Sequence, residues 1–315
     1  MASVPAKIVV VGSINTDLVV RVPSLPRPGE TVIGGSFTSV GGGKGANQAV
    51  AAARAGGTTT LIAKLGADAM GDAAMAAFAA EGIDTTFVTR DSAAPSGVAF
   101  ILVDERGENS IAVAAGANDQ LSPADVDRAR DAIRAADILL VQLEIPLETV
   151  RHAVGMAHAA GVPVILNPAP ARPLDSAILQ HVAILTPNET EAELLTGMPV
   201  IEERSAASAA DRLLAMGPRS AVITLGHRGA LVADAAQTEH MAAHGVAPVD
   251  TVAAGDVFNG CLAVAIAEGK SLVEAARFAN AAAAIAVTRR GAQASAPRRD
   301  EILRFQSSLQ DSFSP

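Results

Sequence analysis

Short runs of β-branched residues alternate with longer, alanine-rich runs along most of this chain. The strand-like runs are continuously apolar, as at residues 8–11 and 164–166, and helical patterns such as residues 147–160 separate them. Parallel strands need a crossover of a dozen or more residues, so this alternation predicts a mostly parallel sheet covered by helices on both faces. The expected fold class is therefore α/β, with three α/β/α layers. The other expected strands are 60–63, 138–142, 184–185 and 221–225, and the other expected helices are 46–55, 70–81, 123–135, 189–196 and 206–216.

Two stretches interrupt the alternation. Residues 18–22 and 31–40 form one pair of strand-like segments, and residues 97–103 and 109–114 form another. No helix separates the members of either pair, so each pair is expected to be antiparallel and to lie outside the main sheet. We expect a small sheet, formed by about 18–40 and 97–114, that joins the main body through residues 41–43. An apolar face on so small a sheet needs a cover.

Length and composition narrow the functional classes. The 315 residues suffice for one large α/β domain or two smaller ones, and no linker divides residues 1–315, so a single domain is expected. A net charge of −9 argues against nucleic-acid or anionic-membrane partners. The single cysteine, Cys261, is expected to be a buried, inert thiol, although its place shortly after Asp256 leaves a functional role open. Residues 1–22 resemble a strand entering a sheet more than a signal peptide, and a cytoplasmic location is expected.

Within residues 250–260, small residues and Gly255 lead to Asp256, and the apolar run 257–266 begins directly after it. This pattern predicts a helix start with uncovered backbone N–H groups, which attracts a phosphate. Asp256 could also accept a proton from an incoming hydroxyl. A phosphate cradle beside a base is what a kinase acting on an alcohol needs. The simpler alternative is that Asp256 only caps the helix.

Two other polar segments suit a sugar. Residues 41–49 are rich in glycine without the spacing of a Walker loop, which indicates a hinge or a close approach to a ligand. Lys44 and Asn47 there lie three residues apart and share a helix face. Asn15 and Asp17 follow the strand 8–11, where ligands of parallel sheets bind, and their side chains suit sugar hydroxyls. Taken alone, an ordinary turn explains Asn15 and Asp17 better.

Seven segments in this order resemble the ribokinase family of carbohydrate and nucleoside kinases. The resemblance spans residues 7 to about 305. One position departs from it, because Gly41 stands where many members carry a bulkier residue, and this glycine is expected to loosen the hinge. The matching segments are residues 12–17, 28–31, 42–49, 167–171, 186–193, 250–256 and 281–293.

The resemblance implies transfer of the γ-phosphoryl group of ATP to O5 of D-ribose, with Asp256 as the base. It places N–H groups around the transferring phosphoryl at Ala253, Ala254, Gly255 and Asp256. The residues expected to contact the sugar are Asn15, Asp17, Gly43, Lys44, Asn47, Glu144 and Asp256.

The resemblance also implies sites for the nucleotide and for two cations. Asn188 would lie near the phosphates and Glu191 near hydrated Mg²⁺, while a helix-capping pair explains the same spacing. With no Tyr or Trp in the chain, adenine is expected to rest on aliphatic groups and backbone. His227 and Arg228 are expected to form a solvated tip without chemistry. The implied ATP-binding residues are Asn188, Thr224, Gly226, Gly229, Gly255 and Asn280, and those around a monovalent cation, K⁺, are Asp250, Val252, Ala286, Arg289, Gly291 and Ser295.

The small sheet is implied to be a lid that closes over the sugar and pairs with a second subunit, giving a homodimer. The alternatives are a sibling kinase for deoxyribose, fructose or a nucleoside, and a catalytically inactive sugar or nucleotide sensor. Only Phe37 and Phe100 could hold a second base in the lid, which disfavours a nucleoside as the acceptor.

Overall fold

A large, mostly parallel sheet forms the centre of the computed structural model, which describes residues 5–311; the ends of the expected domain, 1–4 and 312–315, lie outside it. Of the strand pairs that it describes in this sheet, those that involve β12 or β13 are antiparallel and the rest are parallel. The order across the sheet is β13 (Thr238–Met241), β12 (Ala230–Asp234), β11 (Ser220–Thr224), β10 (Ile184–Leu185), β9 (Val164–Leu166), β8 (Ile138–Val141), β1 (Lys7–Val11), β4 (Thr58–Gly66) and β5 (Asp84–Asp91).

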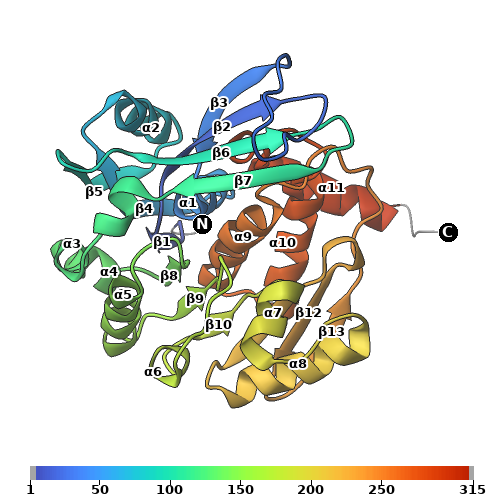
Figure 1. Ribbon diagram of the computed structural model, residues 1–315. Helices are drawn as coiled ribbons and strands as arrows, with labels where there is room; N and C mark the ends of the chain where they lie inside the picture. The colour runs from blue at the N-terminus through green and yellow to red at the C-terminus, as the bar shows by residue number, and fades with distance from the viewer. Residues whose placement is uncertain (1–4, 312–315) are drawn as a thin grey trace.

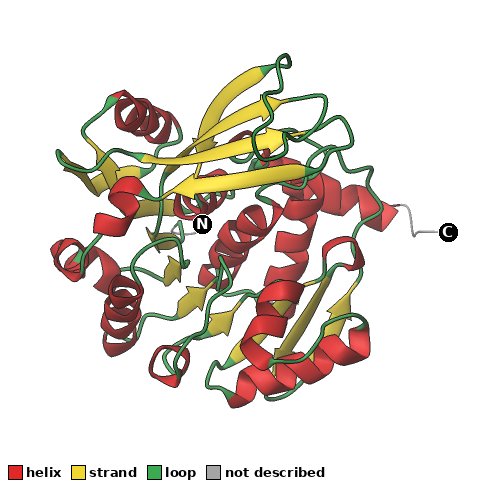
Figure 2. Cartoon of the chain, viewed as in Figure 1, coloured by secondary structure: helices red, strands yellow, loops and turns green. Residues whose placement is uncertain are grey.

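Helices cover both faces of this sheet, as Figure 2 shows. Alternate side chains of β1 belong to different cores, since Ile8 and Val10 pack on one side and Val9 and Val11 on the other. This confirms the expected α/β class with its mostly parallel central sheet. The first core includes residues of α1 (Lys44–Arg54), α2 (Ala69–Ala80), α9 (Ala254–Ala267), α10 (Leu272–Ala286) and α11 (Arg299–Asp311); the second includes α3 (Pro123–Arg128), α4 (Arg130–Arg134), α5 (Leu147–Ala159), α6 (Ser176–Leu179), α7 (Glu189–Thr196) and α8 (Glu203–Ala215).

The expected elements agree with the structure where strands are buried on both faces. β9, β10 and α7 have the expected bounds. The expected helix at 123–135 is wrong in one respect, because its backbone breaks at Ala129 between α3 and α4. Three strands were not expected, namely β5, β12 and β13. Polar residues fill the edge strands β5 and β13, which lack a continuous apolar run, whereas β12 is buried and mostly apolar.

The small sheet has the order β3 (Phe37–Gly42), β2 (Asn15–Arg21), β6 (Gly97–Val103) and β7 (Asn109–Ala114). In Figure 1 these blue to green strands lie across one end of the main body. Both expected pairs are antiparallel, and β2 pairs with β6 in parallel. The sheet joins the main body as expected, because Gly42 ends β3 and Gly43 precedes α1 directly.

The bounds of the first two strands of this small sheet differ from the prediction. The first strand begins at Asn15 and not at residue 18, and the second begins at Phe37 and not at residue 31. Gly34 and Gly35 explain the later start, since their φ angles of 115° and 103° belong to a region that a strand does not use. Asn15 and Asp17 are therefore strand residues, and the interpretation as an ordinary turn is wrong.

Candidate active site

The sheet order reverses at the carboxyl ends of β1 and β8. From β1 the chain continues to β4 on one side, while β8 lies on the other side. Glu144 follows β8, and its Oε2 accepts hydrogen bonds from Ser13 Oγ at 2.5 Å and from the Lys44 backbone N–H at 3.0 Å. A carboxylate is thus held at the first turn of α1, where the helix dipole favours it. Ligands of open α/β sheets bind at such a reversal.

Two glycines allow α1 to begin this close to the end of β1. Gly43 has a φ of 87°, and a Cβ on it would lie 2.6 Å from the Asn15 nitrogen. A Cβ on Gly45 would lie 2.5 Å from the Ser13 nitrogen. Both contacts are with backbone, which cannot move aside easily. The glycine-rich segment is therefore a close approach of two chain segments, whereas the sequence interpretations were a hinge or a close approach to a ligand.

Asn15 and Asp17 of β2 lie near the end of β1 and have different surroundings. Asn15 Oδ1 accepts a hydrogen bond of 2.8 Å from Asn118 Nδ2, in the 3₁₀ turn η1 (Gly116–Gln120). Asp17 is buried, and its burial together with the negative charges of Glu144 and Asp256 raises its pKa to about 6, although Lys44 opposes the shift. An acceptor carboxylate and a polar amide thus lie under the small sheet.

Lys44 is the cation among these carboxylates. Its pKa is raised chiefly by the negative charge of Asp256 and further by Glu144, Glu191 and Asp17, which outweigh its desolvation. The lysine therefore stays charged although it is partly buried. It neutralises part of a cluster that would otherwise be strongly repulsive, and it offers a positive group to a polyanionic ligand.

Asp256 lies in the first turn of α9 but does not cap it. The residue that precedes the helix is Ala253, which has no side-chain cap and a φ of 59°. It is the non-glycine residue with positive φ within residues 5–311, and such a conformation costs roughly 1–2 kcal/mol. Asp256 instead points to α1, whose Asn47 Nδ2 and Gln48 Nε2 each donate to it at 2.9 Å. The capping interpretation is therefore wrong. No side chain at the cap position accepts a hydrogen bond from the first N–H groups of α9.

Asn188 and Glu191 form the capping box that the sequence allowed. The Asn188 side chain accepts from the Glu191 N–H at 2.8 Å, and Glu191 Oε2 accepts from the Asn188 N–H at 2.8 Å. Burial raises the pKa of Glu191 and the charge of Asp256 adds to the shift, against the Asn188 hydrogen bond and Lys44. Asn188 also bridges to Thr224 at the end of β11. These three residues line the carboxyl ends of β10 and β11.

The turn at Gly226 and Gly229 is anchored, which corrects one expectation. Gly226 opens the 3₁₀ turn η2 (Gly226–Arg228), and a Cβ on Gly229 would lie 1.9 Å from the Met241 carbonyl oxygen. Arg228 does not form a free tip, because its guanidinium pairs with Glu189 and donates to the carbonyl of Ile201. The turn is held to α7 on one side and to the end of β13 on the other.

Asn280 forms part of a cavity of about 410 Å³ at the end of β13. Its Nδ2 donates to the Ala242 carbonyl at 3.0 Å. The cavity has two imidazole rings, and the ring of His244 packs edge-on against Phe305 at 5.3 Å between centroids. Burial lowers the pKa of His244, which favours a neutral ring. Its lining residues are Glu239, His240, Met241, Ala242, His244, Arg277, Asn280 and Gln306.

The segments expected around a monovalent cation meet in the structure. Asp250 Oδ2 accepts from the Gly291 N–H at 3.0 Å, and the N–H groups of Val249 and Asp250 both donate to the Val287 carbonyl. Arg289 is turned away and pairs with Glu301 at 2.5 Å. Val252, Ala286 and Ser295 complete the set, and Ser295 Oγ donates to the Ala292 carbonyl at 2.7 Å.

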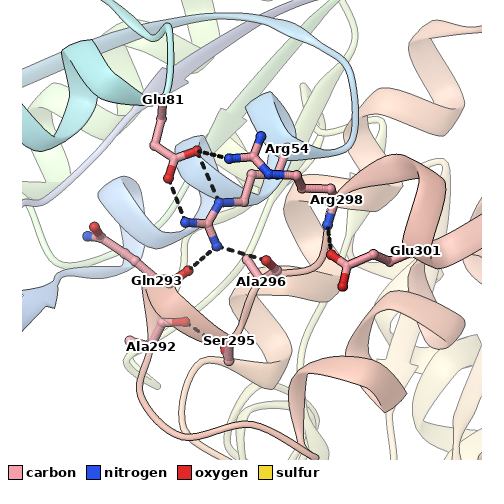
Figure 3. Close-up of polar contacts among 8 residues, drawn as sticks. All are labelled: Arg54, Glu81, Ala292, Gln293, Ser295, Ala296, Arg298 and Glu301. Atoms are coloured by element: carbon pink, nitrogen blue, oxygen red, sulfur yellow. Dashed lines mark hydrogen bonds and ion pairs between the residues drawn. The ribbon is translucent and has the colours of Figure 1, made fainter.

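Arg54 at the end of α1 fixes this loop, as Figure 3 shows. Its Nη1 donates to the carbonyls of Gln293 and Ala296 at 2.8 Å each, and its Nη2 pairs with Glu81 at 2.5 Å. The Gln293 side chain lies against Gly41, where a Cβ would come within 2.6 Å of Oε1. Gln293 thus occupies the space of the missing side chain, which argues against the loosened hinge expected at Gly41.

Several residues of the site were not expected from the sequence. Ser13, Gln48, Gln142 and Asn167 all lie at the carboxyl ends of strands or in the first turns of α1 and hydrogen-bond to the predicted residues or to one another. Ser13, Gln48 and Asn167 do fall in the matching segments 12–17, 42–49 and 167–171, so the resemblance was the available signal. Cys261 is buried, and burial raises its pKa to about 12, which confirms the expected inert thiol.

Two absences concern the described part of the chain. Among residues 5–311, no group of three or more His, Cys, Asp or Glu side chains could by itself hold a metal ion. Across the same residues, no helix combines the length and the apolar character that crossing a bilayer requires.

Comparisons with known proteins agree with this geometry. A family model described as "pfkB family carbohydrate kinase" matches residues 5–299. The chain is 47% identical to a ribokinase of Haemophilus influenzae over 296 residues, covering 94% of this chain and 97% of the relative. It is 39% identical to a deoxyribokinase of Salmonella typhi over 301 residues, covering 95% and 98%. The solved structure of Arabidopsis thaliana ribokinase complexed with ribose and ATP has a TM-score of 0.89 and 34% identity, covering 96% and 99%. This chain belongs to the pfkB family of carbohydrate kinases.

Proposed function

We propose that this protein is a kinase that transfers the γ-phosphoryl group of ATP to O5 of D-ribose, giving ribose 5-phosphate and ADP. One observation carries the proposal: the Asp256 carboxylate lies beside an uncapped helix start and is hydrogen-bonded to the sugar-site residue Asn47. Similarity to a ribokinase at 47% identity over nearly the whole chain supports ribose as the acceptor.

The sugar binds in the crevice between β1 and β8, under the small sheet. Asp17 and Glu144 accept hydrogen bonds from its hydroxyls, Asn15, Lys44 and Asn47 contribute further polar contacts, and Gly43 lets the sugar approach the backbone. Asn47 Oδ1 is buried and has no hydrogen-bond partner among the described residues. A buried acceptor without a partner is costly, so a donor from the ligand is expected there.

Proton and phosphoryl transfer then follow from the position of Asp256. The carboxylate takes the proton of the O5 hydroxyl as O5 bonds to the γ-phosphorus, while the bond from phosphorus to the bridging oxygen breaks and its electron pair leaves with ADP. N–H groups of Ala253, Ala254, Gly255 and Asp256 stabilise the charge on the transferring group. The αL conformation of Ala253 suits this role, because strained backbone gathers at functional sites.

The nucleotide lies along the carboxyl ends of β10 and β11. Asn188 and Thr224 are near its phosphates, and Gly226 and Gly229 border it. The cavity beside Asn280 receives the base, with the imidazole of His244 available for stacking, so aliphatic groups need not carry adenine alone. Glu191 fits Mg²⁺ through water only, since Asn188 already engages both of its oxygens. When bound, this ion neutralises phosphate charge.

A K⁺ ion fits the loop formed by Asp250, Val252, Ala286, Arg289, Gly291 and Ser295. Asp250 joins the two halves of this loop, and Arg54 fixes the second half to α1. A K⁺ ion held there would order residues 250–252, which lie directly before the phosphate-binding turn.

Assembly and location complete the proposal. Residues 1–315 act as a single kinase domain, and the small sheet is a lid that pairs with a second copy. Phe37, Phe100, Ile111 and Val113 of this sheet are each more than half exposed, which favours such a cover. The net charge of −9 favours neither nucleic acid nor membrane as partner, and the protein works in the cytoplasm.

A coupled ADP-release assay tests the function. Ribose, deoxyribose, fructose and nucleosides are compared with and without K⁺, and Asp256→Asn is the control for contaminating kinases. Ribose should give the highest kcat/KM. If ribose is inactive while another acceptor is phosphorylated, the substrate assignment is wrong. Deoxyribose is the second candidate, because the deoxyribokinase of Salmonella typhi is 39% identical.

A further inference from the structure

The two oxygens of Asp256 have different environments. Oδ2 accepts from Asn47 Nδ2, and Oδ1 accepts from Gln48 Nε2, both at 2.9 Å. Asn47 and Gln48 are adjacent on α1, so their side chains leave the helix in directions about 100° apart and approach the carboxylate from two sides. Asn47 belongs to the sugar site, whereas Gln48 is completely buried. Oδ2 therefore lies on the side of the proposed sugar site, and Oδ1 lies on the side of the buried amide of Gln48.

The amide of Gln48 can take only one orientation. Its Nε2 donates to Asp256 Oδ1 and to Asn167 Oδ1 at 3.1 Å, and its Oε1 accepts from Gln142 Nε2 at 2.5 Å. An ionised carboxylate only accepts hydrogen bonds, so the NH₂ group must face Asp256. Asn167 is fixed in turn, because its Nδ2 donates to the Thr186 carbonyl at 2.9 Å.

This chain of amides begins at the carboxyl ends of three central strands of the large sheet. Gln142 follows β8, Asn167 follows β9 and Thr186 follows β10. All three are buried, like Gln48. A side chain held by such a network loses little freedom, and a base must be held close to its productive geometry.

We propose that Gln48 is the positioning residue of Asp256: it holds Oδ1 in the interior, so that Oδ2 is the oxygen that accepts the hydroxyl proton. This inference rests on the proposed function. Gln48 does not touch the substrate and acts through the orientation of the carboxylate.

The test removes the donor and keeps the side-chain length. Gln48→Met should lower kcat by about tenfold or more, because the carboxylate loses its fixed orientation. KM for ATP and for the sugar should change by less than about threefold, since no ligand contact is removed. Thr149→Val is the matched control, because Thr149 Oγ1 is also buried and donates a single hydrogen bond, at 2.7 Å to the Leu121 carbonyl, far from Asp256 in the sequence. The control should keep kcat within about twofold of wild type.

A second variant separates positioning from stability. In Gln48→Glu the introduced carboxyl donates to Asp256 only while protonated, so the ratio of its kcat to that of wild type should rise as pH falls from about 8.5 to about 6. The charge of Asp256 also interacts with Asp17 on β2, Lys44 on α1 and Glu191 on α7. These groups are present in both proteins, so dividing the variant kcat by the wild-type kcat at each pH cancels most of the effect of their titration. A ratio independent of pH, or a kcat of Gln48→Met equal to that of the control, would overturn the inference.

Unfolding measurements test the contact between Gln48 and Asp256 independently of turnover. Urea unfolding of Gln48→Met, Asp256→Asn and the double variant should be clearly non-additive if the amide binds the carboxylate. Additive effects would overturn the inference. If wild type phosphorylates none of the acceptors, the proposed function fails, and this cycle still decides whether Gln48 holds Asp256.

Discussion

Gly260 allows α9 to pack directly on α1, and replacing it by alanine is the sharpest test of the site geometry. A Cβ at Gly260 would lie 2.5 Å from the Gln48 carbonyl oxygen, 2.7 Å from the Ala51 Cβ and 2.8 Å from the Ala52 nitrogen. Ordinary contact begins at 3.4 Å, so the two helices must separate by up to about 0.9 Å. Two of the three neighbours are backbone atoms, which cannot rotate away.

The separation of α1 and α9 in Gly260→Ala should affect both the stability of the protein and its kcat. Overpacking of this kind costs about 1–3 kcal/mol of unfolding free energy. Asp256 lies one turn before Gly260, and its bonds of 2.9 Å to Asn47 and Gln48 would lengthen with the same movement. A displacement near 1 Å in a reacting group costs on the order of a hundredfold in rate, so Gly260→Ala should lower kcat by roughly ten- to a hundredfold.

Urea unfolding and the ADP-release assay measure the two effects, with Gly155→Ala as the control. Gly155 lies inside α5, and a Cβ there meets no atom within 4 Å. This control should raise the unfolding free energy by roughly 0.5–1 kcal/mol and leave kcat unchanged. If Gly260→Ala unfolds like wild type and keeps its kcat within twofold, the helices tolerate a side chain there and the packing argument is refuted.

Three other predictions concern the charges of the site. Asp256→Asn removes the proton acceptor, so kcat should fall by roughly a hundredfold or more while calorimetry still detects ATP binding; turnover within a few-fold of wild type would exclude Asp256 as the base. The pKa of Asp17 is raised from 3.8 to about 6, so its contribution favours the folded state below about pH 4 and is lost as pH rises to about 6. Asp17→Asn should therefore be more stable than wild type at pH 7.5 by up to about 3 kcal/mol but not at pH 3.5, with a raised KM for ribose; equal urea midpoints of the two proteins at pH 7.5 would contradict the shift. Replacing K⁺ by Na⁺ should lower kcat roughly ten- to a hundredfold while the Tm of the protein without substrates stays constant, and activity indifferent to K⁺ would remove the ion from the mechanism.

Local sequence patterns predicted the interior of the sheet well. Strands buried on both faces, such as β8 and β9, must be continuously apolar, and that pattern survives in the sequence. The edge strand β5 carries polar residues on its exposed positions, so its pattern matched no strand template. Asn188 and Glu191 form the capping box allowed by their spacing, because that motif depends on residues three apart.

Long-range contacts of the site could not be read in the same way. Gln48 and Asp256 meet across 208 positions of sequence, and nothing local marks an amide as the partner of a carboxylate. The capping role of Asp256 was an open alternative because the sequence does not show where its side chain points, and its hydrogen bonds to Asn47 and Gln48 decide against it. The loosened hinge at Gly41 was expected for a related reason, since Gln293, which fills the space, lies far along the chain.

The small sheet also dictates the order in which parts of this protein can fold during synthesis. Its strand β2 pairs with β3, which follows soon after, but also with β6, whose Gly97 lies opposite Asn15. The strands β4 and β5 of the large sheet are made in the interval between these partners. One edge of β2 is therefore unpaired on the ribosome until residue 103 has emerged, and an unpaired edge can bind a strand of another chain. Nascent chains arrested between residues 42 and 97 therefore expose this edge of β2.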